Sequence, residues 1–410
     1  MILNRTNQGR VLSAASISLL FSPLLAVQQS ELPTLKTLET LIRNRATARS
    51  KVASDPLGYG SDLFFYVNWP AQPSYRGRPD AGRKFGDTGT TVWETWKNSA
   101  EVYLRCGGRP ESWNAVELVP PSVLSRPLLP SDSGKSWQNM TSNVQADGLA
   151  QADLQRNDLL YEIRLNDKTF DYILKNKIYN IDGQVSFARE KGDLDFAFDA
   201  VEAKASWHWL DPNETTAGCR PQDYFTANAY YAQLDNNGKV TGYKTGLMGL
   251  TGLHIITKAV PQWVWITFEQ KNNPQCIGVN RVTPISPDVV AENQAMAPIM
   301  QQSGKWANYQ LVGVQTSAGR ADKPLLLANT QIESAFQSRS SCLTCHQFAS
   351  VATHFPVQPE DNLRKPFVDP GVTPPYYIGP APPLGAPYKA MDFVWSLRRA
   401  SRLQPGGCVQ

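Results

Sequence analysis

The residues with the clearest chemical potential form a short motif near the C-terminus, Cys342-Leu343-Thr344-Cys345-His346. Two thiols three positions apart can add across the two vinyl groups of a haem, and the histidine that follows directly can bind the iron. The motif predicts one covalent haem c, attached through Cys342 and Cys345, with His346 as the proximal ligand. The alternative is a redox-active dithiol of thioredoxin type, but no strand pattern of the kind that precedes such dithiols ends before residue 342.

The ligand on the opposite side of the iron decides the class of function. A Met or His there makes a closed electron-transfer site, whereas an open side permits binding of oxygen, peroxide or nitric oxide. Met391 is the only methionine after the motif, and it is the first candidate for the distal ligand. Packing in a hydrophobic core is its alternative role. His254 is the alternative distal ligand, with Glu269 or Lys204 as its expected partner if it is buried.

The N-terminus has the pattern of an export signal. Arg5 and Arg10 precede an uncharged apolar stretch, residues 11–27, so residues 1–28 are expected to be a signal peptide and the protein to be periplasmic or otherwise exported in a bacterium. An uncleaved membrane anchor is the alternative. Haem attachment to such a motif also takes place outside the cytoplasm in bacteria. The most apolar later window, residues 247–268, contains charged and proline residues, so no integral membrane span is expected after signal removal.

Four cysteines remain outside the motif: Cys106, Cys219, Cys276 and Cys408. An oxidising compartment permits disulfides between them, and three pairings are conceivable. We expect Cys219 to pair with Cys276, because both flank the same predicted sheet region. The sequence does not decide whether Cys106 and Cys408 are paired or free.

Composition describes a globular protein, with 41% hydrophobic and 19% charged residues. The net charge is +4, and no long basic run is present, so nucleic acid is not an expected partner.

Hydrophobic periodicity predicts an α+β fold. Residues 29–325 are expected to form a β-rich, sandwich-like region with some helices, because strand patterns and a turn at 235–238 dominate residues 150–280. Helices are expected within 31–54, 90–104 and 167–177. Residues 326–410 are expected to form a small all-α haem domain, with a capping box at Thr330–Glu333, a proline-rich loop at 356–388 and a closing helix at 388–403.

This C-terminal region resembles the class I c-type cytochromes, which also combine a helix, the haem motif, a proline-rich loop and a last helix with aromatic residues. The whole chain is similar to exported bacterial monohaem cytochrome-like proteins with a large N-terminal region, which share segments such as residues 93–97, 252–258 and 263–269. The resemblance implies electron transfer to or from a redox partner protein whose identity it does not give, with a distal methionine supplied before the last helix.

A second function remains open. A haem enzyme, or a protein that binds gas or peroxide, would leave the iron open or weakly ligated and cover it with the N-terminal region. Its pocket would then contain His254, Trp263 and Trp265. The sequence identifies no catalytic residue, no substrate and neither the electron donor nor the acceptor.

Overall fold

The computed structural model describes residues 31–410, apart from 135, 143–158, 237–238, 318, 321–322, 348, 354–387, 407 and 409–410. The predicted signal peptide and almost all of the predicted proline-rich loop lie outside the described residues.

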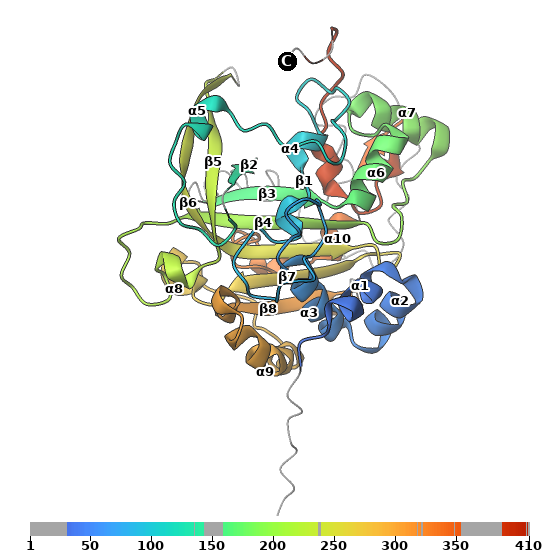
Figure 1. Ribbon diagram of the computed structural model, residues 1–410. Helices are drawn as coiled ribbons and strands as arrows, with labels where there is room; N and C mark the ends of the chain where they lie inside the picture. The colour runs from blue at the N-terminus through green and yellow to red at the C-terminus, as the bar shows by residue number, and fades with distance from the viewer. Residues whose placement is uncertain are drawn as a thin grey trace, which may run out of the picture.

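Strands β1 to β8 form one central eight-stranded sheet (Figure 1). Its longest strand, β6, pairs with β4 along one edge. The other edge of β6 pairs with β5 in its first half and with β7 in its second, and β8 continues the sheet beyond β7. The strands are β1 (Lys97–Asn98), β2 (Trp137–Met140), β3 (Leu159–Leu165), β4 (Val201–Trp209), β5 (Thr226–Leu234), β6 (Val240–Thr257), β7 (Val264–Gln270) and β8 (Tyr309–Gln315).

The α+β class is therefore correct, but the sandwich-like arrangement is wrong. The described part of the chain covers the central sheet with helices and loops, and adds only two small two-stranded sheets, β9–β10 (Gly319–Arg320, Lys323–Pro324) and β11–β12 (Ser350–Ala352, Tyr388–Ala390). The strand patterns in the sequence do not specify which strands share a sheet. Long β6 accepts partners on both edges, which joins in one sheet the strands that a sandwich would separate.

One face of the sheet is covered by the N-terminal helices α1 (Leu35–Arg43), α2 (Arg45–Ser54) and α3 (Pro56–Val67), together with α9 (Pro287–Gln301). Each of the first three helices is capped at its N-terminus by a side-chain oxygen that accepts a backbone N–H of the first turn. The capping residues are Thr34, Asn44 and Asp55. The ring of Phe64 stacks on Phe268 of β7 at 3.9 Å between centroids. This layer buries the larger hydrophobic core.

The opposite face carries α6 (Asp167–Asn176), α7 (Ile181–Lys191) and the C-terminal segment, which contains α10 (Cys342–His346), the β11–β12 hairpin and a 3₁₀ turn at Trp395–Arg399. Apolar side chains of this segment, including Leu343, Met391 and Leu397, share one buried cluster with Ile163 and Trp265 of the sheet. The predicted haem motif is thus part of a layer on the sheet.

The described residues of 326–410 therefore do not form the separate all-α haem domain that we predicted. The predicted helix at Thr330 is a series of turns, and β12 and the 3₁₀ turn replace the predicted closing helix. Asp392 and Phe393 have φ of 49° and 68°, which a right-handed helix cannot contain. The predicted helix at 90–104 is also wrong, because a 3₁₀ turn, β1 and α4 (Ser99–Val102) take its place.

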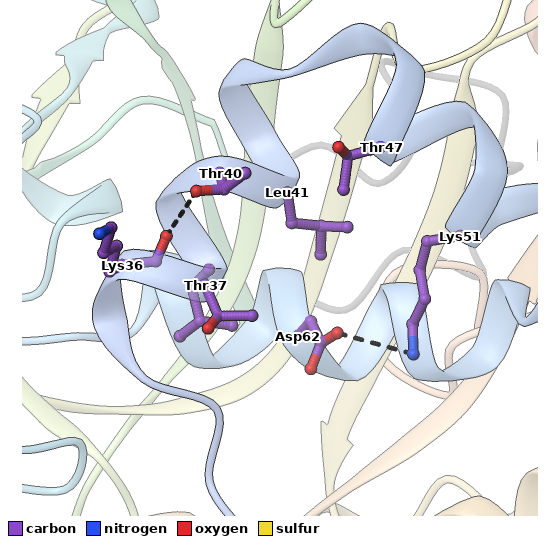
Figure 2. Close-up of a pocket in the computed structure, with 8 residues that line it drawn as sticks. Lys36, Thr37, Thr40, Leu41, Thr47, Lys51 and Asp62 are labelled. Carbon is purple, nitrogen blue, oxygen red and sulfur yellow. Dashed lines mark hydrogen bonds and ion pairs between the residues drawn. The ribbon is translucent and has the colours of Figure 1, made fainter.

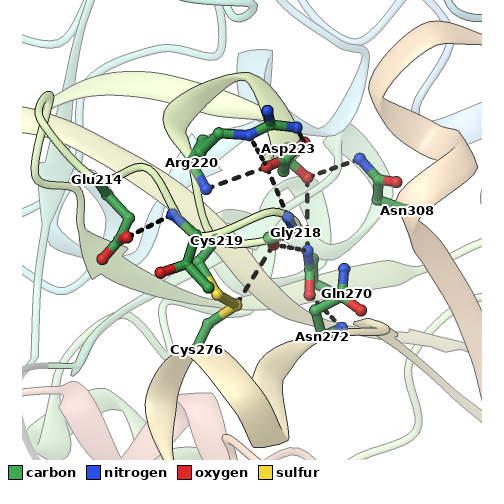
Figure 3. The surroundings of a disulfide bond; sticks show 10 residues. Glu214, Gly218, Cys219, Arg220, Asp223, Gln270, Asn272, Cys276 and Asn308 are labelled. Atoms are coloured by element: carbon green, nitrogen blue, oxygen red, sulfur yellow. Dashed lines mark hydrogen bonds and ion pairs between the residues drawn. A yellow bond between two sulfur atoms is a disulfide. The ribbon is translucent and has the colours of Figure 1, made fainter.

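The predicted disulfide between Cys219 and Cys276 is confirmed (Figure 3). It ties the connection between β4 and β5 to α8 (Asn273–Ile277), and Gln270 supports it by donating from Nε2 to the Gly218 carbonyl at 3.0 Å. Cys106 and Cys408 form a second disulfide that fastens the C-terminus to the chain after α4.

The remaining short elements are α5 (Pro121–Leu124) and 3₁₀ turns at Trp93–Thr95, Pro221–Asp223, Gly304–Asn308 and Gln337–Arg339. Among the described helices, none has the length and apolar character needed to cross a bilayer.

Because the apolar side chains of this segment pack on the sheet, we expect residues 326–410 to remain unfolded when they are produced without the rest of the chain. Circular dichroism and amide NMR dispersion would measure this, with the full chain as control. Cooperative unfolding and dispersed amide signals from the isolated segment would contradict the layered arrangement.

Candidate haem attachment site

The two thiols of the motif are half-buried on a single turn of helix, α10. The Cys345 N–H donates to the Ser341 carbonyl at 3.0 Å. Residues three apart on a helical turn lie on the same face, so Cys342 and Cys345 point to one side. Both are free thiols, whereas the other four cysteines of the sequence form the two disulfides. This is the geometry that attachment to two vinyl groups of one haem requires.

The sheet holds α10 in place through Gln315 at the end of β8. Its Oε1 accepts the Leu343 N–H at 3.1 Å, and its Nε2 donates to the Ser341 hydroxyl at 2.9 Å. At the other end of α10, Trp395 Nε1 donates to the Cys345 carbonyl at 3.2 Å. A helix of five residues is unstable by itself, so these contacts determine its position.

The imidazole of His346 is oriented by a backbone carbonyl. Nδ1 lies 2.7 Å from the Phe393 carbonyl oxygen, and because that oxygen can only accept, Nδ1 carries the proton. The lone pair then lies on Nε2, the nitrogen left for a metal. The ring also packs against Trp265 of β7, with 4.3 Å between centroids. Burial, with smaller contributions from the charges of Lys204 and His254, lowers the pKa of His346 to about 4, so the ring is neutral.

The thiols are held in the protonated form. Burial raises the pKa of Cys345 to about 11 and that of Cys342 well above its ordinary value, and the charge of Glu333 adds to both shifts. A reactive thioredoxin-type dithiol needs the opposite, a lowered thiol pKa. Free thiols on one side and a neutral imidazole with Nε2 available fit haem c.

Met391 is fully buried, at 0% exposure, in the cluster that also contains Leu343. Its backbone N–H donates to the Ala349 carbonyl at 2.8 Å. It lies two residues before Phe393, whose carbonyl contacts the side of the imidazole that faces away from Nε2. Met391 therefore lies next to the segment whose carbonyl orients His346.

His254 lies on the face of the sheet that carries the motif. In β6 it alternates with Leu253 and Ile255, which belong to the core on the other face. Its Nε2 is 3.4 Å from Oε2 of Glu333. Burial by itself would raise the pKa of Glu333, but the charge of His254 and the Asn329 N–H lower it.

Some of these residues were not predicted. The carboxylate beside His254 comes from Glu333, whereas Glu269, which we expected there, binds Arg281 and the Thr330 hydroxyl. Lys204 is paired with His254 in the sheet register. The carbonyl of Phe393 gives no sequence signal, because every residue has one.

Of the two tryptophans expected in a pocket, Trp265 contacts His346, and Trp263 is fully buried against Phe196.

A cavity of about 430 Å³ lies between α1, α2 and α3 (Figure 2), in the layer on the other face of the sheet from the haem motif. Lys51, its basic residue on α2, is 3.9 Å from Asp62 across the cavity and 2.8 Å from Asp55. Its polar groups thus interact with one another. The lining residues are Lys36, Thr37, Leu38, Thr40, Leu41, Thr47, Lys51 and Asp62.

No protein-family model, no curated protein and no solved structure matches this chain.

We expect Gln315→Ala to destabilise the protein by about 1–3 kcal/mol, because the substitution leaves buried polar groups at the start of α10 without their partner. Urea denaturation of the intact protein measures the change. Gln301→Ala at an exposed position of α9 is the matched control, with an expected change within about 0.5 kcal/mol. Equal effects of the two substitutions would show that Gln315 does not hold α10.

Proposed function

We propose that the protein is an exported bacterial monohaem c-type cytochrome that transfers electrons, with haem c attached to Cys342 and Cys345 and His346 as the proximal ligand. The observation that carries the proposal is the bond between His346 Nδ1 and the Phe393 carbonyl at 2.7 Å. It leaves Nε2 as the ligating atom, directly after two free thiols on one helical turn. The haem, when bound, supplies one-electron redox chemistry.

The residues around the motif provide a rigid setting. Gln315 holds the start of α10 and Trp395 its end, while Trp265 packs on the imidazole. Fixed ligand geometry suits electron transfer, because it limits rearrangement between the two oxidation states. A redox partner protein would be the donor or acceptor.

Export to the periplasm is part of the same proposal. Two disulfides, Cys106–Cys408 and Cys219–Cys276, are typical of an oxidising compartment. The apolar segment 11–27 after Arg5 and Arg10 provides the export signal.

We expect the haem of wild-type protein to remain with the protein during acid–acetone extraction, because thioether bonds survive it. The double variant Cys342→Ala/Cys345→Ala should either release its haem into the organic phase or be isolated without haem. Cys219→Ser/Cys276→Ser is the control, because it removes two cysteines outside the motif and should keep its haem. Haem extracted from fully matured wild-type protein would refute covalent attachment.

His254 is the better candidate for the distal side, and Met391 acts as a core residue. Met391 lies beside the carbonyl that supports His346, whereas His254 faces the motif from the sheet. The His254–Glu333 pair also favours a second function, a haem enzyme or gas- or peroxide-binding protein in which the pair lines an open side of the iron.

Carbon monoxide binding to ferrous protein distinguishes these roles. If His254 ligates the iron, His254→Ala should bind carbon monoxide readily and wild type should not. Met391→Leu, which conserves volume, should behave as wild type in visible spectrum and reduction potential. If Met391→Leu alone opens the iron, Met391 is the distal ligand. If wild type already binds carbon monoxide readily, the second function is favoured.

A further inference from the structure

The carbonyl that orients His346 belongs to a strained turn. The Val394 N–H donates to the Met391 carbonyl at 3.0 Å, and the two residues between them, Asp392 and Phe393, both have positive φ. This is the pattern of a type I′ turn, which strongly favours Asn, Asp or Gly at these positions. A phenylalanine there is unfavourable and persists only where neighbouring contacts determine the conformation.

A buried ion pair supplies such contacts. The carboxylate of Asp392 is 6% exposed and binds Lys258 Nζ, at 2.7 Å from Oδ2. Oδ2 also accepts the Phe196 N–H at 2.8 Å. Both bonds fix the first central residue of the turn, and therefore the direction of the following Phe393 carbonyl.

Lys258 connects this turn to the sheet. It directly follows β6, its backbone N–H donates to the Ala200 carbonyl at 2.9 Å, and its Nζ donates to the Pro261 carbonyl at 3.1 Å. Its side chain is 9% exposed. Because a buried charge left without its partner is costly, the pair constrains the turn strongly.

We propose that Asp392 and Lys258 are positioning residues for the haem: together they hold the Met391–Val394 turn so that the Phe393 carbonyl accepts the Nδ1 proton of His346. The inference rests on the proposed haem function and extends it to the control of the reduction potential. A hydrogen bond at Nδ1 makes the imidazole a more basic ligand, which stabilises ferric iron. Loss of the bond therefore raises the potential.

The charges of the two residues provide a way to separate positioning from simple electrostatics. Removing the negative charge of Asp392 would raise the potential, and removing the positive charge of Lys258 would lower it, if charge alone mattered. If the pair acts by positioning, both substitutions release the turn and both raise the potential.

The experiment uses full-length, haem-loaded protein with Asp392→Asn, Lys258→Met, Lys258→Arg and Asp195→Asn. Asp195 lies 3.1 Å from Lys258 Nζ, but its side chain is 85% exposed, so Asp195→Asn is the matched control. The readouts are the reduction potential and the solvent exchange of the His346 Nδ1 proton by NMR. We expect Asp392→Asn and Lys258→Met to raise the potential and speed exchange at least tenfold. In Lys258→Arg, the potential and the exchange rate should stay nearer to those of wild type. In Asp195→Asn, both should equal those of wild type.

Opposite shifts of the potential in Asp392→Asn and Lys258→Met, or unchanged proton exchange in both, would overturn the inference while leaving covalent haem intact. Absence of covalent haem from wild type would instead refute the proposed function. If Asp392→Asn does not fold, the comparison of Lys258→Met with Lys258→Arg decides, because a raised potential and faster exchange only in the methionine variant support positioning.

Discussion

The hydrogen bond between His346 Nδ1 and the Phe393 carbonyl is the interaction on which the candidate haem site depends. It joins two segments 47 residues apart in sequence, and it determines which imidazole nitrogen is free for iron. The carbonyl can occupy its place only because the turn around it adopts left-handed backbone at Asp392 and Phe393. The site therefore depends on tertiary contacts as much as on the motif.

Those tertiary contacts come from the sheet. Gln315 of β8 holds α10, Trp265 of β7 packs on His346, and Lys258 after β6 holds the turn. A small cytochrome domain would have to supply such support from its own helices. Here the N-terminal region supplies it, which gives that region a physical role in the candidate haem site in addition to any role in binding a partner.

The sequence predicted what short-range chemistry specifies. The thiol and imidazole spacing of residues 342–346 identifies the motif. The Cys219–Cys276 disulfide spans 57 residues, and it was predicted because both cysteines flank one region of strand patterns. Residues 262–269 are apolar on both faces, which suits a central strand, and β7 does lie between β6 and β8.

The predictions that were wrong concern segments whose conformation depends on long-range packing. The capping box predicted at Thr330–Glu333 is not formed: Glu333 accepts the Asn329 N–H, the Thr330 hydroxyl donates to Glu269, and no helix follows. The carboxylate of Glu333 also contacts His254, and the Asn329 amide donates to the Phe268 carbonyl. Likewise, the apolar residues of 388–403 are periodic enough for a helix, and the Asp392–Lys258 pair favours a turn. The residues that make these contacts lie in or directly after β6 and β7, and the local sequence does not show that they are partners.

The most direct test of the haem assignment is the mass of the peptide that contains Cys342, Cys345 and His346, isolated without reduction from protein matured in an exporting bacterial host. We predict that this peptide carries the mass of one haem. An unmodified peptide with two free thiols, or one lighter by the two hydrogens of a Cys342–Cys345 disulfide, would contradict the assignment.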